Sequence, residues 1–143
     1  MSSEFSLQKA HGAYQEGNLV PWIINYLRVQ GNNPDLASRI ERAELKVVQL
    51  CEIPLNKFMR IIGPEEGMIF PESIEVMESR IAKLIEAIKN GEQFPPLVVT
   101  DFWKLGTIQD GAHRYEALKR MGYDKYFAVV LFEKDESLGW LEN

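Results

Sequence analysis

The stretch IQDGAHRYEALKRMGYD, residues 108–124, marks the point at which a strand turns into a helix. We expect the segment KLGTIQD, residues 104–110, to be the strand. A glycine, Gly111, stands at the change of direction, where a backbone without a side chain is useful. A helix from about Ala112 to Met121 is predicted to follow, and Gly122 is placed to end it.

The first turn of this predicted helix has the features of an anion-binding site. The first four N–H groups of a helix have no partner inside it, and the helix dipole adds partial positive charge. Gly111 lets a bound group approach the backbone, Arg114 offers a planar fork for phosphate oxygens, and His113 can donate a further hydrogen bond. Asp110 could cap the helix, act as a base or hold magnesium. The alternative is a plain capped helix, because Asp-Gly turns and solvated first-turn His and Arg side chains are common.

The other expected elements lie on both sides of this turn. The first 44 residues favour helices, because Pro21 and Pro34 suit first turns, Asn33 suits an N-cap and Gly31 suits a helix end. Strands are expected at 44–55, 95–100 and 126–132, a helix at 73–91, a Gly- and Pro-rich loop at 61–73 and a turn near 101–104. The apolar stripe of the 73–91 helix, which Gly91 ends, consists of Ile74, Met77, Ile81, Leu84, Ile85 and Ile88.

This order predicts a mixed α/β (α+β) domain at residues 45–133, preceded by a helical extension at 1–44 and followed by a tail at 134–143. The chain has 143 residues, 45% hydrophobic and 26% charged, as expected for a globular protein. No apolar run approaches the roughly 20 residues of a membrane span, and residues 1–10 lack the pattern of a signal peptide. We therefore expect a cytoplasmic protein. The single cysteine, Cys51, excludes an internal disulfide and is expected to be a small core residue.

The segment DGAHRYEALKRMG, followed by the strand YFAVVLF, resembles the ParB/sulfiredoxin superfamily, in which a G-x-H-R or G-x-R-R turn opens a nucleotide-binding helix. Upstream, EIPLNKFMR, SRIAKLIEAIKNG and FPPLVV resemble the first strand, the central helix and the proline-opened strand of that family. The resemblance covers roughly residues 45–133 and implies a small mixed sheet with packed helices. It does not account for the helical extension.

Three branches of the superfamily use this scaffold differently. Sulfiredoxins repair a cysteine sulfinic acid with ATP, but their catalytic cysteine precedes the His-Arg pair, where this chain has Ala112. Partition proteins bind and hydrolyse CTP and read DNA with a helix-turn-helix region that follows the nucleotide domain. Here the N-terminal helices would have to read DNA, but residues 33–46 carry only Arg39, Arg42 and Lys46 as basic residues, and the net charge is −5. Free-serine kinases use ADP and a D-G-H-H-R turn, from which DGAHR differs at one position.

The resemblance implies a set of site residues. The nucleotide-binding residues would be Arg60, Arg80, Lys83, Gly111, Ala112, His113 and Arg114. Asp110 and Glu66 would form the acid/base pair that also binds magnesium, with Glu65 as the alternative to Glu66. No dedicated set of metal ligands is assigned. The competing interpretation is that Arg80 and Lys83 belong to a solvated face, with partners such as Glu75, Glu78 or Glu86.

Two functions follow from this set. The first is a nucleotide-binding protein that transfers a phosphoryl group from ATP or ADP, with Mg²⁺, to a small hydroxyl acceptor. The second is a non-catalytic nucleotide switch or partner-binding module related to partition proteins, for which CTP is the alternative nucleotide. A DNA-associated role is the least expected for this chain alone, no membrane association is expected, and a homodimer is compatible with either function.

Overall fold

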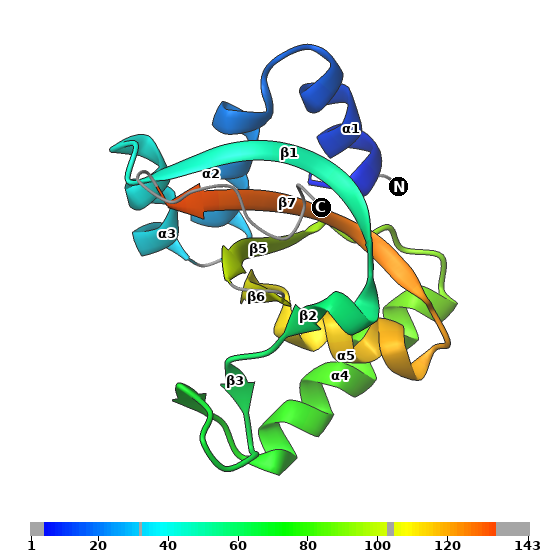
Figure 1. The fold of residues 1–143 in the computed structure, drawn as a ribbon. Coiled ribbons are helices and arrows are strands. Elements are labelled where there is room, and N and C mark those ends of the chain that lie inside the picture. Colours follow the sequence, from blue (N-terminus) through cyan, green and yellow to red (C-terminus); the bar gives the residue numbers. More distant parts are fainter. Residues whose placement is uncertain (1–4, 32, 103–104, 134–143) are drawn as a thin grey trace.

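The computed structural model describes residues 5–31, 33–102 and 105–133 of the chain (Figure 1). The expected tail at 134–143 and half of the expected turn at 101–104 lie outside these residues. In the described part of the chain, no helix combines the length and the apolar character that crossing a membrane requires.

A five-stranded mixed sheet forms the centre of the described structure, in the order β1-β7-β5-β6-β2. Its strands are β1 (Leu45–Pro54), β2 (Phe58–Met59), β5 (Leu97–Phe102), β6 (Leu105–Asp110) and β7 (Lys125–Glu133). The β1–β7 and β5–β6 pairs are antiparallel, whereas β5–β7 and β2–β6 are parallel. The predicted α+β class with a small mixed sheet is confirmed.

The N-terminal helices cover one face of this sheet (Figure 1). They are α1 (Leu7–Gln15), α2 (Leu19–Val29) and α3 (Pro34–Glu41). Ile23 and Leu27 of α2 share one buried cluster with Leu50 of β1 and Val129 of β7. Burying each such side chain stabilises the fold by about 1.5–3 kcal/mol. The helical extension is thus part of the same hydrophobic core as the sheet.

The caps of these helices confirm part of the sequence interpretation. The side chain of Asn33 accepts a hydrogen bond from the N–H of Leu36, and Pro34 lies in the first turn of α3. His11 belongs to α1, and its ring packs edge-on against Phe127 at 4.5 Å between centroids.

The opposite face of the sheet is covered by α5 (Ala112–Arg120), with α4 (Ile74–Lys89) packed against α5 (Figure 1). Met77 and Ile81 of the predicted apolar stripe are buried against α5, but Ile74 at its start is 56% exposed. The stripe therefore starts one turn later than the sequence pattern indicates.

The loop predicted at 61–73 contains a two-stranded parallel ribbon. Its strands are β3 (Ile62–Gly63) and β4 (Phe70–Pro71), and a short 3₁₀ helix, η1 (Leu55–Lys57), precedes β2. Two-residue strands are too short to show the alternation by which strands are predicted from sequence. Cys51 of β1 packs against the core under α5, where burial raises the pKa of its thiol.

Candidate functional site

The turn between β6 and α5 has the conformation that the sequence predicts. Gly111 has φ 107°, in the left-handed region that favours glycine. A Cβ atom at this position would lie 2.7 Å from Leu97 Cδ2 and 2.8 Å from Arg114 Nη2, so a larger residue would also clash. No side chain caps the start of α5 within the described residues. Because the side chain of Ala112 is buried, the backbone is what this residue offers to a ligand.

The side chain of Arg114 points into the protein and not toward solvent. Its side chain is 13% exposed, and Nη2 donates to Pro96 O at 3.0 Å and to Asp110 Oδ2 at 3.1 Å. Its Nε atom is buried and has no hydrogen-bond partner among the described residues. Burial alone would lower the pKa of Arg114, but Tyr26 and Asp110 together raise it above its ordinary value. The guanidinium is therefore a buried, charged group.

Tyr26 of α2 completes this buried cluster. Its hydroxyl donates to Asp110 Oδ2 at 2.7 Å, and the Arg114 guanidinium lies 5.9 Å from the centre of its ring. Tyr26 is 1% exposed and stacks on Trp22, with 5.8 Å between ring centres. Burial raises the pKa of Tyr26 far above its ordinary value; Arg114 lowers it and Asp110 raises it further. The N-terminal helices thus close one side of the turn.

A second cluster lies on the other side of the turn and is centred on Glu72, which follows β4. Its Oε1 atom is 2.6 Å from His113 Nε2, and its Oε2 atom is 3.6 Å from Arg80 Nη1. An ionised carboxylate only accepts hydrogen bonds, so the imidazole N–H is the donor in the first contact. Glu72 is 14% exposed and Arg80 is 59% exposed. A carboxylate of the chain itself is therefore bound between two of the predicted nucleotide-binding residues.

Arg60 belongs to a third group of contacts. Its Nε atom donates to Glu116 Oε2 at 2.9 Å, its Nη1 atom to Ile62 O at 2.7 Å, and its Nη2 atom forms an ion pair with Glu65. The hydrogen bond from Arg60 lowers the pKa of Glu65. A Cβ atom on Gly63 would clash with the side chains of Arg60 and Glu65. Arg60 thereby ties the β3–β4 loop to α5.

Lys83 and Glu66 are exposed, and neither forms an ion pair with another described residue. The structure thus brings the predicted site residues together in two groups, Asp110 with Arg114 and His113 with Arg80, and leaves Lys83 and Glu66 at the surface. Their roles in nucleotide binding stay predictions. The described residues contain no group of three or more His, Cys, Asp or Glu side chains suited to a metal ion.

Sequence reasoning missed two residues of the site, Tyr26 and Glu72. Tyr26 is 84 positions away from Asp110, and it resembles any other aromatic residue on the buried side of a helix. Glu72 stands directly before Ser73, the N-cap of α4, where an acidic residue has an ordinary explanation in the helix dipole. Neither position carries a signal in a single sequence.

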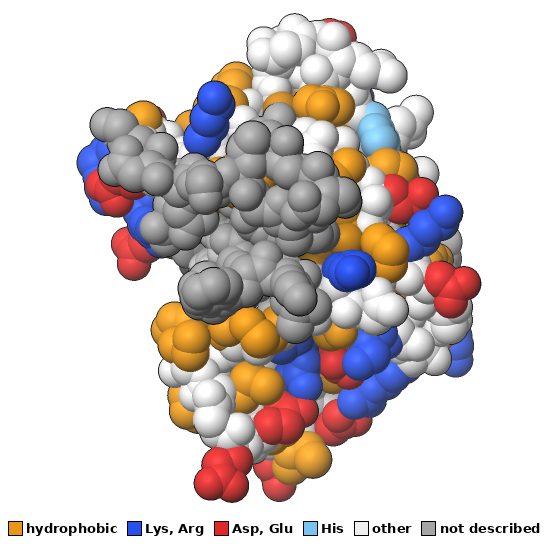
Figure 2. Space-filling view, in the orientation of Figure 1, with side chains coloured by type: hydrophobic (Ala, Val, Ile, Leu, Met, Phe, Trp, Pro, Cys, Tyr) orange, Lys and Arg blue, Asp and Glu red, His pale blue; other side chains and the backbone are white. Residues whose placement is uncertain are grey.

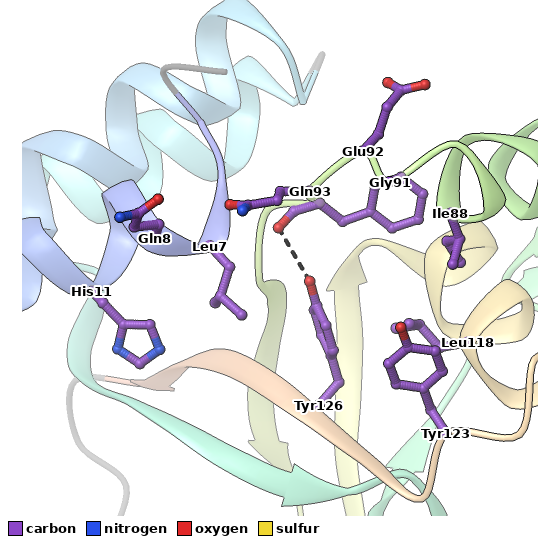
Figure 3. Close-up of a pocket in the computed structure, with 11 residues that line it drawn as sticks. Leu7, Gln8, His11, Ile88, Gly91, Glu92, Gln93, Leu118, Tyr123 and Tyr126 are labelled. Atoms are coloured by element: carbon purple, nitrogen blue, oxygen red, sulfur yellow. Dashed lines mark hydrogen bonds between the residues drawn. The ribbon is translucent and has the colours of Figure 1, made fainter. Parts of the chain in front are cut away.

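One cavity of the described structure lies elsewhere. It has a volume of about 560 Å³, lies between α1 and the C-terminal ends of α4 and α5, and includes none of the predicted site residues (Figure 3). Tyr126 stands in it and donates a hydrogen bond to Phe94 O at 3.1 Å (Figure 3). The Gly111 turn is at the other end of α5, about 13 Å away for a helix of nine residues. The cavity and the turn are separate features.

No family model matches the sequence, and no curated protein matches it. Several solved structures are similar to it, including the following three. A free serine kinase in complex with AMP matches 59% of this chain and 32% of its own, at 19% identity and a TM-score of 0.45. Sulfiredoxin from Arabidopsis thaliana matches 58% and 84%, at 20% identity and a TM-score of 0.43. A Pnob8-like ParB-N domain matches 62% and 30%, at 14% identity and a TM-score of 0.42.

All three similarities have TM-scores below 0.5 and sequence identities of 20% or less. The chain spans about a third of the length of the kinase and of the ParB-N chain. At these identities and TM-scores, the similarity does not bear on what this chain binds. The function is therefore argued from the side chains around Gly111.

Proposed function

We propose that this chain is a nucleotide-binding module whose phosphate site lies at the start of α5, between His113 and Arg80. One observation carries the proposal: the Glu72 carboxylate already lies there, 2.6 Å from His113 Nε2 and next to Arg80. Carboxylate and phosphate groups are bound by the same donors, namely imidazole, guanidinium and helix N-terminal N–H groups. A phosphate that displaced Glu72 would meet donors that already bind an anion.

The cationic side of this site lies on α4. Arg80 is 59% exposed, so its guanidinium is accessible to a ligand without rearrangement of the core. Lys83 is exposed three residues further along the helix, and residues three apart lie on the same side of a helix. Together they would supply the converging positive charge that binding of two or three phosphates requires, and His113 would add a hydrogen-bond donor.

Phosphoryl transfer to a small hydroxyl acceptor is the catalytic form of this proposal. The acceptor oxygen would form the new P–O bond, the bond to the leaving phosphate would break, and the acceptor proton would pass to Asp110. In this form the acceptor hydroxyl would have to displace the Tyr26 hydroxyl, which donates to Asp110 Oδ2 at 2.7 Å. Magnesium would be bound chiefly by the nucleotide phosphates. The exposed Glu66, in the loop between β3 and β4, would supply a carboxylate ligand.

A non-catalytic nucleotide switch is the second candidate, and the buried cluster favours it. Asp110 and Arg114 are 12% and 13% exposed, and Tyr26 closes them off from solvent. Asp110 Oδ2 already accepts hydrogen bonds from an arginine and a tyrosine, so Asp110 is part of a buried structural group. In this version the nucleotide binds on the Glu72 side only and is not turned over.

The proposed site is tested by thermal unfolding with ATP, ADP, CTP and GTP, each with and without Mg²⁺, because a ligand of the folded state raises its stability. We expect a stabilising shift in the wild type that Arg80→Ala abolishes. Arg120→Ala is the matched control, since Arg120 pairs with Glu78 at the other end of α5. The absence of a shift with every nucleotide would contradict the proposal. If a nucleotide does bind, formation of a phosphorylated product by the wild type with serine or another small alcohol would distinguish the kinase from the switch.

A further inference from the structure

Exposed apolar side chains lie next to the Glu72 cluster. Ile69 is 67% exposed, Phe70 is 57% exposed and Ile74 is 56% exposed, all within five residues of Glu72. Hydrophobic side chains also appear beside charged ones over the β3–β4 end of the molecule in the space-filling view (Figure 2). Leaving a phenylalanine ring in water forgoes about 1.5–3 kcal/mol of burial, so its exposure beside an anion site calls for an explanation.

The backbone of β4 fixes the direction of the Phe70 side chain. The N–H of Phe70 donates to Ile61 O and the N–H of Glu72 donates to Gly63 O, both at 2.9 Å. Both N–H groups therefore point to β3, and residues two apart in an extended strand have side chains on the same face. Their Cα atoms are about 6.5 Å apart at that spacing. The Phe70 ring thus stands on the face from which Glu72 reaches His113.

We propose that Phe70 is the stacking platform for the nucleobase of the bound nucleotide, and that it favours purines because they cover more of the ring. The inference rests on the proposed function. A nucleotide carries a phosphate anion and a flat base separated by a sugar, and the face of β4 presents an anion site and an aromatic ring at a similar separation. Tyr115, the aromatic residue in the first turn of α5, is 7% exposed and packed against Phe58, so it is not available to a base.

The test compares a ligand that has a base with one that lacks it. ATP and inorganic tripolyphosphate are titrated by calorimetry into the wild type, Phe70→Ala and the control Tyr14→Ala. Tyr14 is an exposed aromatic residue on α1, on the other side of the sheet. We expect Phe70→Ala to weaken ATP binding about tenfold through loss of stacking and to leave tripolyphosphate binding unchanged. We expect Tyr14→Ala to change neither. A Phe70→Trp variant should retain ATP affinity and lose indole fluorescence on binding.

Each other outcome overturns a defined statement. Equal ATP affinity in the wild type and Phe70→Ala would overturn the platform and leave the phosphate site standing. Equal losses for ATP and tripolyphosphate would also overturn it, because Phe70 would then act through Glu72. Binding of neither ligand by the wild type would overturn the proposed function itself. Unchanged ATP affinity together with loss of self-association in Phe70→Ala, measured by sedimentation, would assign the exposed residues to a protein interface instead.

Discussion

On one side of the Gly111 turn, a tyrosine hydroxyl from α2 is buried against Asp110 and Arg114, whereas on the other side the Glu72 carboxylate lies between His113 and the exposed Arg80. Both arrangements place an acidic group against cations at the same helix start. The two carboxylates are similarly buried, with Asp110 12% and Glu72 14% exposed, but their partners differ: Tyr26 is 1% exposed, while Arg80 is 59% exposed. The contact of the carboxylate therefore has a structural role on the Tyr26 side, whereas on the Glu72 side a ligand can replace the carboxylate.

This difference separates stability from binding. Removing one member of a buried charged group leaves its partner without compensation in a medium of low dielectric, which is strongly destabilising. Removing one member of a group that water can reach changes the free energy of unfolding little. Substitutions on the Tyr26 side should therefore act mainly on folding, and substitutions on the Glu72 side mainly on anion affinity.

The largest effect is expected from Asp110→Ala. The variant would leave the buried Arg114 guanidinium with Pro96 O as its remaining hydrogen-bond acceptor among the described residues and would remove the acceptor of the Tyr26 hydroxyl. We expect a loss of about 3–5 kcal/mol in the free energy of unfolding, measured by urea denaturation at pH 7.

The control for this substitution is Asp124→Ala, because Asp124 is an exposed aspartate in the turn before β7. Its stability should stay within about 0.5 kcal/mol of the wild type. A loss below ~1 kcal/mol in Asp110→Ala would show that Arg114 finds other compensation, and the contrast between the two sides of the turn would fail.

Tyr26→Phe is expected to have the next largest effect. It keeps the stacked ring and removes only the hydroxyl that donates to Asp110 at 2.7 Å. A hydrogen bond to a charged group contributes about 1.5–3 kcal/mol, and the loss is measured in the same urea assay. Tyr14→Phe, at an exposed tyrosine, should be neutral. If Tyr26→Phe also raised the turnover of a small hydroxyl substrate, the hydroxyl would be shown to occupy the acceptor position.

Alkaline pH provides a third comparison. Burial raises the pKa of Tyr26 in the folded state above its ordinary value of 10. Above pH 10 the tyrosine ionises in the unfolded chain but not in the folded one, so the stability that Tyr26 contributes is complete below pH 10 and is lost as the pH rises. By pH 11 the wild type should lose about 1.4 kcal/mol more than Tyr26→Phe, which has no proton to release there. Tyr126→Phe should also reduce the alkaline loss, because burial raises the pKa of Tyr126 to about 12. If the free energy of unfolding depended on pH equally in the wild type and Tyr26→Phe, the raised pKa of a buried Tyr26 hydroxyl would be contradicted.

The sequence predicts the scaffold of this site better than its contacts. The helix that ends near Gly91 and the turn at Gly111 are predicted because glycine ends, caps and apolar spacing are local features. The strands β3 and β4 are missed because two residues show no period. The direction of the Arg114 side chain is not predictable from the chain around it, since it depends on Tyr26, which packs through a core shared by the N-terminal helices and the sheet.

The smallest effect on stability, and the most informative for binding, is expected from Glu72→Gln. The amide keeps the shape and the hydrogen-bonding capacity toward His113, and Arg80 is mostly solvated, so the free energy of unfolding should change by less than ~1 kcal/mol. Glu72 competes with phosphate for the same cations. Removing its charge should therefore strengthen tripolyphosphate binding, by roughly fivefold if the competition amounts to ~1 kcal/mol. Glu75→Gln, at an exposed glutamate in the first turn of α4, is the matched control. Weaker tripolyphosphate binding in Glu72→Gln would mean that the carboxylate positions His113 and does not occupy the phosphate site.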